Sequence, residues 1–173
     1  APSHDDHILC ETMGLGCETD AYDPMEKAML RYCDDMGISK EHLFSGELVS
    51  EYAFTNDLKM MGHVWRRGGK LIIAAKGSPE RLLPLCDMSA EEREAAGHML
   101  VKMGKEGLRV IAVGKMTPAN ESEIPAKLTD CRLDFCGLIG LSDPPRENVA
   151  RDIATCNQAG VRVVMITGDN GIT

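Results

Sequence analysis

The chain has 173 residues, 43% of them hydrophobic, and a formal net charge of -8. This is enough for one ordinary hydrophobic core, or for one domain and part of another, and the negative charge argues against binding to nucleic acid or to an anionic membrane surface. No apolar run approaches the roughly 20 residues of a membrane-spanning helix, and the polar first residues, APSHDDHILC, do not fit a secretory signal.

Cysteine usage favours a reducing compartment. The seven cysteines are odd in number, form no C-x-x-C pair, and in several cases fall inside periodic apolar segments. This pattern predicts reduced, mostly buried thiols rather than a disulfide framework. The residues are Cys10, Cys17, Cys33, Cys86, Cys131, Cys136 and Cys156.

The first element with clear signals is a helix over residues 24–36. Asp23 is a suitable N-cap, Pro24 fits the first helical position, and Gly37 is typical of a helix end. Glu26 completes an Asp-x-x-Glu capping box. One face is predicted to be buried through Met25, Met29, Cys33 and Met36.

Antiparallel strands are predicted next. Residues 47–54 (ELVSEYAF) alternate as a strand does, and residues 60–76 (MMGHVWRRGGKLIIAAK) predict a hairpin. The reversal falls at Gly68 and Gly69, which can adopt the positive φ angles that a tight turn requires.

Two helices follow the hairpin. Ser78, as N-cap before a proline, predicts a short helix that Pro84 ends or bends. Ser89 and Glu92 form a capping box for a longer helix that ends at Gly107. Its buried stripe is predicted to contain Ala96, Met99, Leu100 and Met103.

The remaining chain changes character after residue 141. Residues 108–116 and 133–142 predict strands, separated by a loop over 117–130, and a pair of prolines ends the second strand. A helix is then predicted over 148–158, with Val149, Ile153 and Cys156 inward, followed by a continuous apolar strand over 161–166, which is typical of a parallel sheet.

The domain prediction follows from this change. We expect an α+β domain with a mixed, mainly antiparallel sheet flanked by helices over 1–141, a connection over 142–145, and a helix and strand from an α/β domain over 146–173. There is no internal repeat.

A ligand site is indicated by the motif AAKGSPE. Lys76 ends an apolar strand, and Gly77 and a capped helix start follow it, which makes a compact place for a negatively charged ligand. Taken alone, the motif is more typical of a solvated lysine in a strand-to-helix turn than of a ligand site.

Read with AFTNDLKMM, GLRVIAV, SDPPR and MITGDN in this order, the motif gives a specific signal. Together they resemble the nucleotide-binding domain of the cation-transporting P-type ATPases and the first part of the haloacid-dehalogenase-like phosphorylation domain into which it is inserted. The resemblance implies that the family's Asp-Lys-Thr-Gly-Thr motif lies just upstream of Ala1, that more of the phosphorylation domain follows Thr173, and that this chain is a fragment that binds nucleotide without hydrolysing it.

The resemblance also implies a set of nucleotide-binding residues. Phe54 would stack on adenine, Lys59 and Lys76 would line the pocket, Gly77 would let the backbone approach the ligand, and Arg109 would reach the phosphates of ATP with its Mg²⁺. Stacking a base on an aromatic ring is worth roughly 1–3 kcal/mol. For Phe54, a core ring at the end of a strand is the alternative.

Glu26 matches the acidic residue that the family places near the adenine amine. The capping box competes for the same side chain, because a carboxylate folded back onto its own helix cannot reach a base. The chain departs from the family pattern at Met25 and Asn56, where Thr and Arg are common, and at Ser78, where Ala is usual. Serine is expected to cap the helix better.

The C-terminal motifs are assigned by resemblance as well. Asp143 and Arg146 would form the hinge and an edge of the phosphorylation site, although an ordinary surface turn also explains them. Thr167, Gly168 and Asp169 would approach a phosphate and Mg²⁺.

A second cluster near the N-terminus is less informative. His4 and His7, with Asp5 and Asp6 between them, have ligand atoms for a metal, but a polar cluster near a terminus is usually solvated. We therefore predict no metal site there.

The leading hypothesis is the ATP-binding domain of a cation pump, at the cytoplasmic face of a membrane. Its partners would be ATP and the phosphorylation, actuator and transmembrane domains of the pump. The alternatives are a small haloacid-dehalogenase-type phosphatase using Asp169, which lacks the required Asp-x-Asp after an early strand, and a non-enzymatic interaction module. The apolar faces after Pro145 are expected to dock on the main domain or on a neighbouring molecule, as in a swapped dimer.

Overall fold

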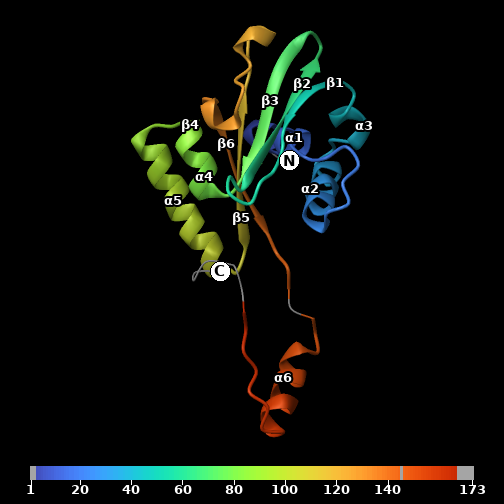
Figure 1. Cartoon of the computed structure of the whole chain (residues 1–173), viewed down its shortest axis with the longest axis vertical. Helices are drawn as coiled ribbons and strands as arrows, with labels where there is room; N and C mark the ends of the chain where they lie inside the picture. Colours follow the sequence, from blue (N-terminus) through green and yellow to red (C-terminus); the bar gives the residue numbers. More distant parts are fainter. Residues whose placement is uncertain (1–2, 145, 167–173) are drawn as a thin grey trace.

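The computed structural model describes residues 3–144 and 146–166, and its centre is a six-stranded sheet (Figure 1). The strand order is β1-β2-β3-β5-β6-β4, and every neighbouring pair is antiparallel except the parallel pair of β4 with β6. The strands are β1 (Glu47–Tyr52), β2 (Met60–Arg67), β3 (Lys70–Gly77), β4 (Cys86–Asp87), β5 (Arg109–Met116) and β6 (Leu133–Leu141). The predicted α+β class and the mixed, mainly antiparallel sheet are confirmed.

Helices cover both faces of this sheet. α1 and α2 pack on one face, α4 lies on the other, and α5 packs against β5 and β6. The helices are α1 (His4–Leu15), α2 (Pro24–Asp35), α3 (Lys40–Leu43), α4 (Pro79–Leu82), α5 (Ala90–Lys105) and α6 (Val149–Gln158). Short 3-10 turns occupy Leu83–Leu85, Glu121–Glu123 and Leu128–Asp130. None of the described helices combines the length and apolar character that a bilayer crossing requires.

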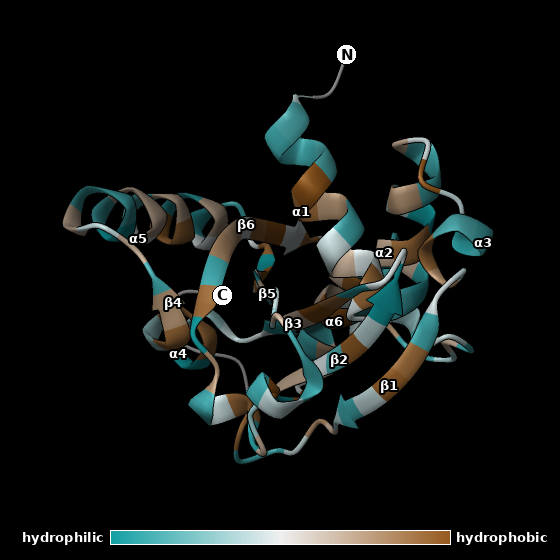
Figure 2. Ribbon diagram, turned by 90° about the horizontal axis from the view of Figure 1, so that it is seen from above, coloured by the Kyte–Doolittle hydropathy of each residue, from teal (hydrophilic) through white to brown (hydrophobic). Residues whose placement is uncertain are grey.

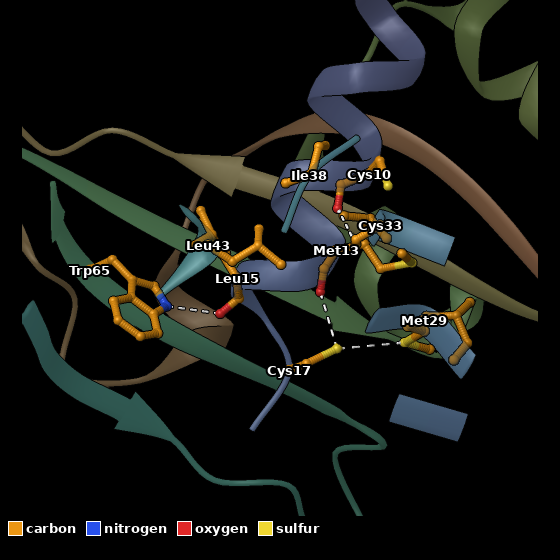
Figure 3. Packing of buried hydrophobic residues seen from close by; sticks show 12 residues of the cluster. Cys10, Met13, Leu15, Cys17, Met29, Cys33, Ile38, Leu43 and Trp65 are labelled. Atoms are coloured by element: carbon orange, nitrogen blue, oxygen red, sulfur yellow. Dashed lines mark hydrogen bonds between the residues drawn. The ribbon is translucent and has the colours of Figure 1, made fainter. Parts of the chain in front are cut away.

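The core is split in two because successive strand side chains point to opposite faces of the sheet. Trp65 of β2 and Ala74 of β3 belong to the cluster beneath α1 and α2, which also contains buried methionines and cysteines (Figure 3). Val64 and Ile73, their immediate neighbours in sequence, belong to the cluster on the opposite face. All seven cysteines are unpaired, and five of them are buried, as predicted.

Helix α1 was not predicted. Its start has a capping box, in which Ser3 Oγ accepts a bond from Asp6 N at 3.1 Å and Asp6 Oδ2 accepts one from Ser3 N at 2.9 Å. Its first turn is hydrophilic (Figure 2), and the buried half uses Thr12 and Gly14 beside apolar residues. A Cβ on Gly14 would lie 2.7 Å from Leu43 Cδ1, so the helix packs through a small residue that gives no apolar periodicity.

Several local predictions are confirmed. Asp23 caps α2, the hairpin turns at Gly68 and Gly69 with φ angles of 53° and 77°, and Ser89 and Glu92 form the capping box of α5. The prediction of which residues form the buried stripe of α5 was partly wrong. Its buried residues are Ala96 and Gly104, whereas Met99 is 44% exposed.

The end of the described chain differs from the prediction. α6 forms where expected but lies apart from the sheet (Figure 1), with Val149 and Ile153 37% and 40% exposed. Residues 161–166 are exposed and form no strand, because no described segment lies beside them to accept the hydrogen bonds. The prediction that these apolar faces dock on the main domain is therefore wrong for the described residues. The alternative, docking on a neighbouring molecule, stays a prediction.

Candidate functional site

The ends of five strands meet at one edge of the sheet. The register pairs Met60, the start of β2, with Gly77, the end of β3, and it pairs Arg109, the start of β5, with Leu141, the end of β6. The loop over 53–59 connects β1 to β2 at this same edge. The topology thus gathers the predicted residues 54, 59, 76, 77 and 109 at one end of the sheet.

Lys76 and Glu26 form a buried ion pair at this edge. Lys76 Nζ lies 2.5 Å from Glu26 Oε1, and the two side chains are only 6% and 10% exposed. Glu26 Oε2 accepts a second bond from Glu18 N at 3.2 Å, and Lys76 Nζ lies 3.4 Å from Met61 Sδ. The two predicted residues that are farthest from the surface are therefore bonded to each other.

The ion pair shows that the Glu26 carboxylate does not fold back to cap its own helix. Asp23 Oδ1 accepts bonds from Met25 N at 2.7 Å and Glu26 N at 3.2 Å, so Asp23 caps the helix, but Glu26 does not return the bond. The predicted capping box is half wrong. The reason is physical: a buried ammonium offers a charge-assisted hydrogen bond, which is stronger than a bond from an exposed backbone N–H.

The residues packed beneath the pair are buried and mostly apolar. Cys17 is fully buried, and its Sγ contacts Met13 O at 3.4 Å and Met29 Sδ at 3.8 Å (Figure 3). Burial raises the pKa of the Cys17 thiol to about 12, against the opposing effect of the Lys76 ammonium. Lys76 and Glu26 thus interact in a poorly hydrated environment, where breaking a pair is costly.

The other predicted side chains, Phe54, Lys59 and Arg109, are exposed at this edge of the sheet, and we call them the rim. Phe54 is 54% exposed, which excludes the alternative of a core ring at the strand end. Lys59 is exposed and adopts a φ of 52°, and its carbonyl accepts a bond from Ser78 N at 2.9 Å. The loop that carries both residues is thereby tied to the turn after β3.

Arg109 lies on the rim as well. Val113 of β5 pairs with Lys76, and Arg109 is four residues from Val113, so its side chain emerges on the same face of the sheet. Four residues of strand span about 14 Å. Arg109 and Lys76 therefore mark two ends of an elongated area rather than one point.

Packing of the strands explains why a glycine occupies position 77. A Cβ at this position would lie 2.6 Å from Met60 Cα and 2.7 Å from Lys59 O. Any side chain would therefore push β2 and β3 apart. Approach of the backbone to a ligand stays a prediction.

Ser78 was expected to cap α4, and this is wrong. No side-chain cap bond forms, and Ser78 Oγ is buried without a hydrogen-bond partner in the described part of the chain. Its backbone is held by the bond to Lys59, and α4 has only four residues.

The predicted hinge leaves the sheet at the same edge. Asp143 and Arg146 follow β6 and are exposed, and Arg146 O accepts a bond from Val149 N at 3.0 Å. The residues Thr167, Gly168 and Asp169 lie outside the described residues. Both predicted roles stay predictions.

Sequence reasoning missed a polar group on β1 and β2. His63 is 1% exposed, and its ring lies beside the carboxylates of Glu18 and Glu51. The available signal was a histidine at an inward position of an apolar strand, opposite an acidic residue on the preceding strand.

Comparisons with known proteins identify the family of this chain. A family model for the P-type ATPase cytoplasmic domain N matches residues 18–148, which include both members of the buried pair and the described rim. Calcium-transporting ATPase 1 of Bacillus cereus is 31% identical over 94% of this chain and 20% of its own length. The sodium/potassium exporting P-type ATPase cta3 of Schizosaccharomyces pombe is 30% identical over 86% of this chain and 15% of its own length.

A probable cation-transporting ATPase F of Mycobacterium tuberculosis is 33% identical over 87% of this chain and 18% of its own length. The chain thus spans about a fifth or less of the length of these relatives. The match to the family model extends over the whole sheet and most of its helices. The chain therefore belongs to the P-type ATPase family and contains its cytoplasmic domain N.

Proposed function

We propose that the chain binds ATP and presents it to the phosphorylation domain of a P-type cation pump. In this proposal an aspartate of the phosphorylation domain takes the γ-phosphoryl group, and the resulting aspartyl phosphate drives ion transport across a membrane. Mg²⁺ accompanies the nucleotide. The domain works at the cytoplasmic face of the membrane, next to the phosphorylation, actuator and transmembrane domains.

The proposal depends mainly on one observation. The buried pair of Lys76 and Glu26 lies at the same sheet edge as the exposed ring of Phe54. The pair offers a hydrogen-bond donor and an acceptor in a dry setting, which suits the polar edge of an adenine. The exposed ring of Phe54 offers a face on which the base can stack. A purine needs both kinds of contact at once.

The phosphates would be held farther along the rim. Lys59 and Arg109 are exposed cations at the same sheet edge, and neither forms an ion pair within the described part of the chain. On a chain with a net charge of -8, locally placed cations of this kind are needed to attract a triphosphate.

The connection after β6 supports the transfer step. Asp143 and Arg146 leave the sheet at the edge where the nucleotide would lie, so a turn about this segment would carry the bound nucleotide toward the phosphorylation domain. In this proposal Thr167, Gly168 and Asp169 approach the phosphate there. The match to domain N counts against the phosphatase and interaction-module alternatives.

Calorimetric titration of MgATP tests the stacking role. Phe54→Ala should weaken binding by about 1–3 kcal/mol, which is roughly 5- to 150-fold. The matched control is Tyr32→Ala, which removes a 48% exposed ring from α2, away from the sheet edge. The fluorescence of Trp65, the single tryptophan, reports whether each variant is folded.

A second pair of variants tests the rim cation. Lys59→Met should weaken MgATP binding, and the loss should shrink at high salt because exposed charges are screened. Lys70→Met, at the opposite end of the hairpin, should leave the affinity unchanged. Equal heats for the parent chain, Phe54→Ala and Lys59→Met would contradict the proposal.

A further inference from the structure

Three side chains with metal-ligating atoms converge on the face of the sheet covered by α1 and α2. His63 lies on β2, Glu51 is its direct cross-strand partner on β1, and Glu18 lies in the loop after α1. One ligand atom from each lies within 4.8 Å of the others. We propose that His63, Glu18 and Glu51 bind a divalent cation of the zinc class, a role that does not depend on nucleotide binding.

The imidazole is already oriented as a ligand. His63 is 1% exposed, and its Nδ1 lies 3.1 Å from Leu15 O, which also accepts a bond from Trp65 Nε1 at 2.8 Å. A carbonyl can only accept, so Nδ1 carries a proton, and in the neutral imidazole Nε2 then presents its lone pair. Metal-binding histidines commonly donate their other N–H to a backbone carbonyl in this way.

The lone pair of Nε2 faces the carboxylates without a hydrogen bond to any described residue. Nε2 lies 3.9 Å from Glu18 Oε1, which is too far for a hydrogen bond. Two ligand atoms on a tetrahedral zinc ion lie about 3.3 Å apart. For this pair, closing the difference requires a movement of about half an ångström by the Glu18 side chain, which is 44% exposed and therefore able to move. The remaining ligand atoms lie within 4.8 Å of one another, so the exposed Glu51 side chain would have to move by at most about 1.5 Å.

The charge at the site favours a cation. In the described part of the chain, neither Glu18 nor Glu51 forms an ion pair with a lysine or arginine, and Lys76 is bonded to Glu26. Leu15 is the last residue of α1, so the negative end of this helix also lies at the site.

The donor set selects the class of metal. One imidazole nitrogen and two carboxylate oxygens suit zinc and similar ions, whereas Mg²⁺ and Ca²⁺ prefer oxygen ligands alone and more of them. Three protein ligands leave a fourth position for water. Glu18 also connects this site to the buried pair, since its backbone N–H donates to Glu26.

Zinc binding to the parent chain, measured in competition with a chromogenic chelator, is the direct test. We expect binding of one ion, weakened at least about 10-fold by Glu51→Gln and by Glu18→Gln. Both carboxylates are at the surface, so these variants keep the fold. His63→Gln should lose binding as well, while its amide still donates to Leu15 O.

Cobalt supplies an independent readout. Co²⁺ in the site should show the visible absorption of a four-coordinate ion and should quench Trp65, which shares the Leu15 carbonyl with His63. Quenching should be lost in Glu51→Gln. Two control variants remove other histidines that lie beside carboxylates: the double variant His4→Gln/His7→Gln and His42→Gln, whose Nε2 lies 3.6 Å from Glu11 Oε1. Both should behave as the parent chain does.

Two results would overturn the proposal. One is a parent chain that binds no zinc. The other is zinc binding that survives both Glu18→Gln and Glu51→Gln, because it would assign the ion to other ligands, such as the cysteines, the N-terminal histidines or His42 with Glu11.

Discussion

Removing one member of the buried pair should destabilise the chain strongly. Lys76→Met leaves the Glu26 carboxylate, which is 10% exposed, with the Glu18 N–H as its one partner among the described residues. An uncompensated buried charge of this kind costs about 3–5 kcal/mol of unfolding free energy. Since domains of this size are stable by about 5–15 kcal/mol, the variant should still fold, with a smaller margin.

The double variant separates charge from packing. Lys76→Met with Glu26→Gln contains no buried charge, and the amide can still accept the bond from Glu18 N. Its unfolding free energy should return to about the parent value or exceed it by 1–4 kcal/mol, since an apolar replacement avoids the desolvation of both ions.

Urea unfolding without nucleotide measures both variants. Trp65 is the single tryptophan and is 2% exposed, so its fluorescence follows loss of the core. Lys70→Met, at the exposed start of β3, should stay within about 0.5 kcal/mol of the parent chain. A loss below about 1 kcal/mol for Lys76→Met, or a double variant as unstable as the single one, would refute the argument from desolvation.

Three other substitutions have expected outcomes. Ser78→Ala removes a buried hydroxyl that has no hydrogen-bond partner among the described residues, and it should raise the melting temperature by an amount equivalent to about 1 kcal/mol. A lower melting temperature would show that the hydroxyl has a partner. Gly77→Ala should cost about 1–3 kcal/mol in urea unfolding, because its Cβ would collide with Met60, and an unchanged midpoint would contradict that close approach. The pKa of Cys17 is higher in the folded chain than in the unfolded chain, so the stability that depends on its protonation is complete at neutral pH and is lost as the pH rises toward about 12. Unfolding free energies measured in urea from about pH 8.5 upward should therefore fall less steeply for Cys17→Ala than for the parent chain, by up to about 1.4 kcal/mol per pH unit, and parallel profiles would refute this.

Elements with local signals were predictable from sequence. The cap at Asp23, the capping box of Ser89 with Glu92, and the turn at Gly68 and Gly69 all formed as expected. Each depends on hydrogen bonds or φ angles within four residues, so the neighbouring sequence contains the whole interaction.

Elements that depend on packing were harder to predict. α1 is buried partly through Thr12 and Gly14, and the two residues of β4 are a strand only because β6 lies beside them. The apolar run over 161–166 shows the converse. Its composition favours a strand, yet no described segment pairs with it. Apolar pattern predicts a strand only when the chain also supplies its neighbour.

The candidate site divides in the same way. The order of the motifs was sufficient to identify the family and to select Phe54, Lys59, Lys76, Gly77 and Arg109, since each motif is a short run of residues with its own chemistry. Tertiary structure alone decided the partner of Glu26, because the choice lay between a cap three residues away and a lysine 50 residues away. It also brought His63 together with Glu18 and Glu51. Such contacts depend on burial. A charged group that is removed from water loses its hydration, so the strongest available hydrogen bond or ion pair in the folded chain is favoured.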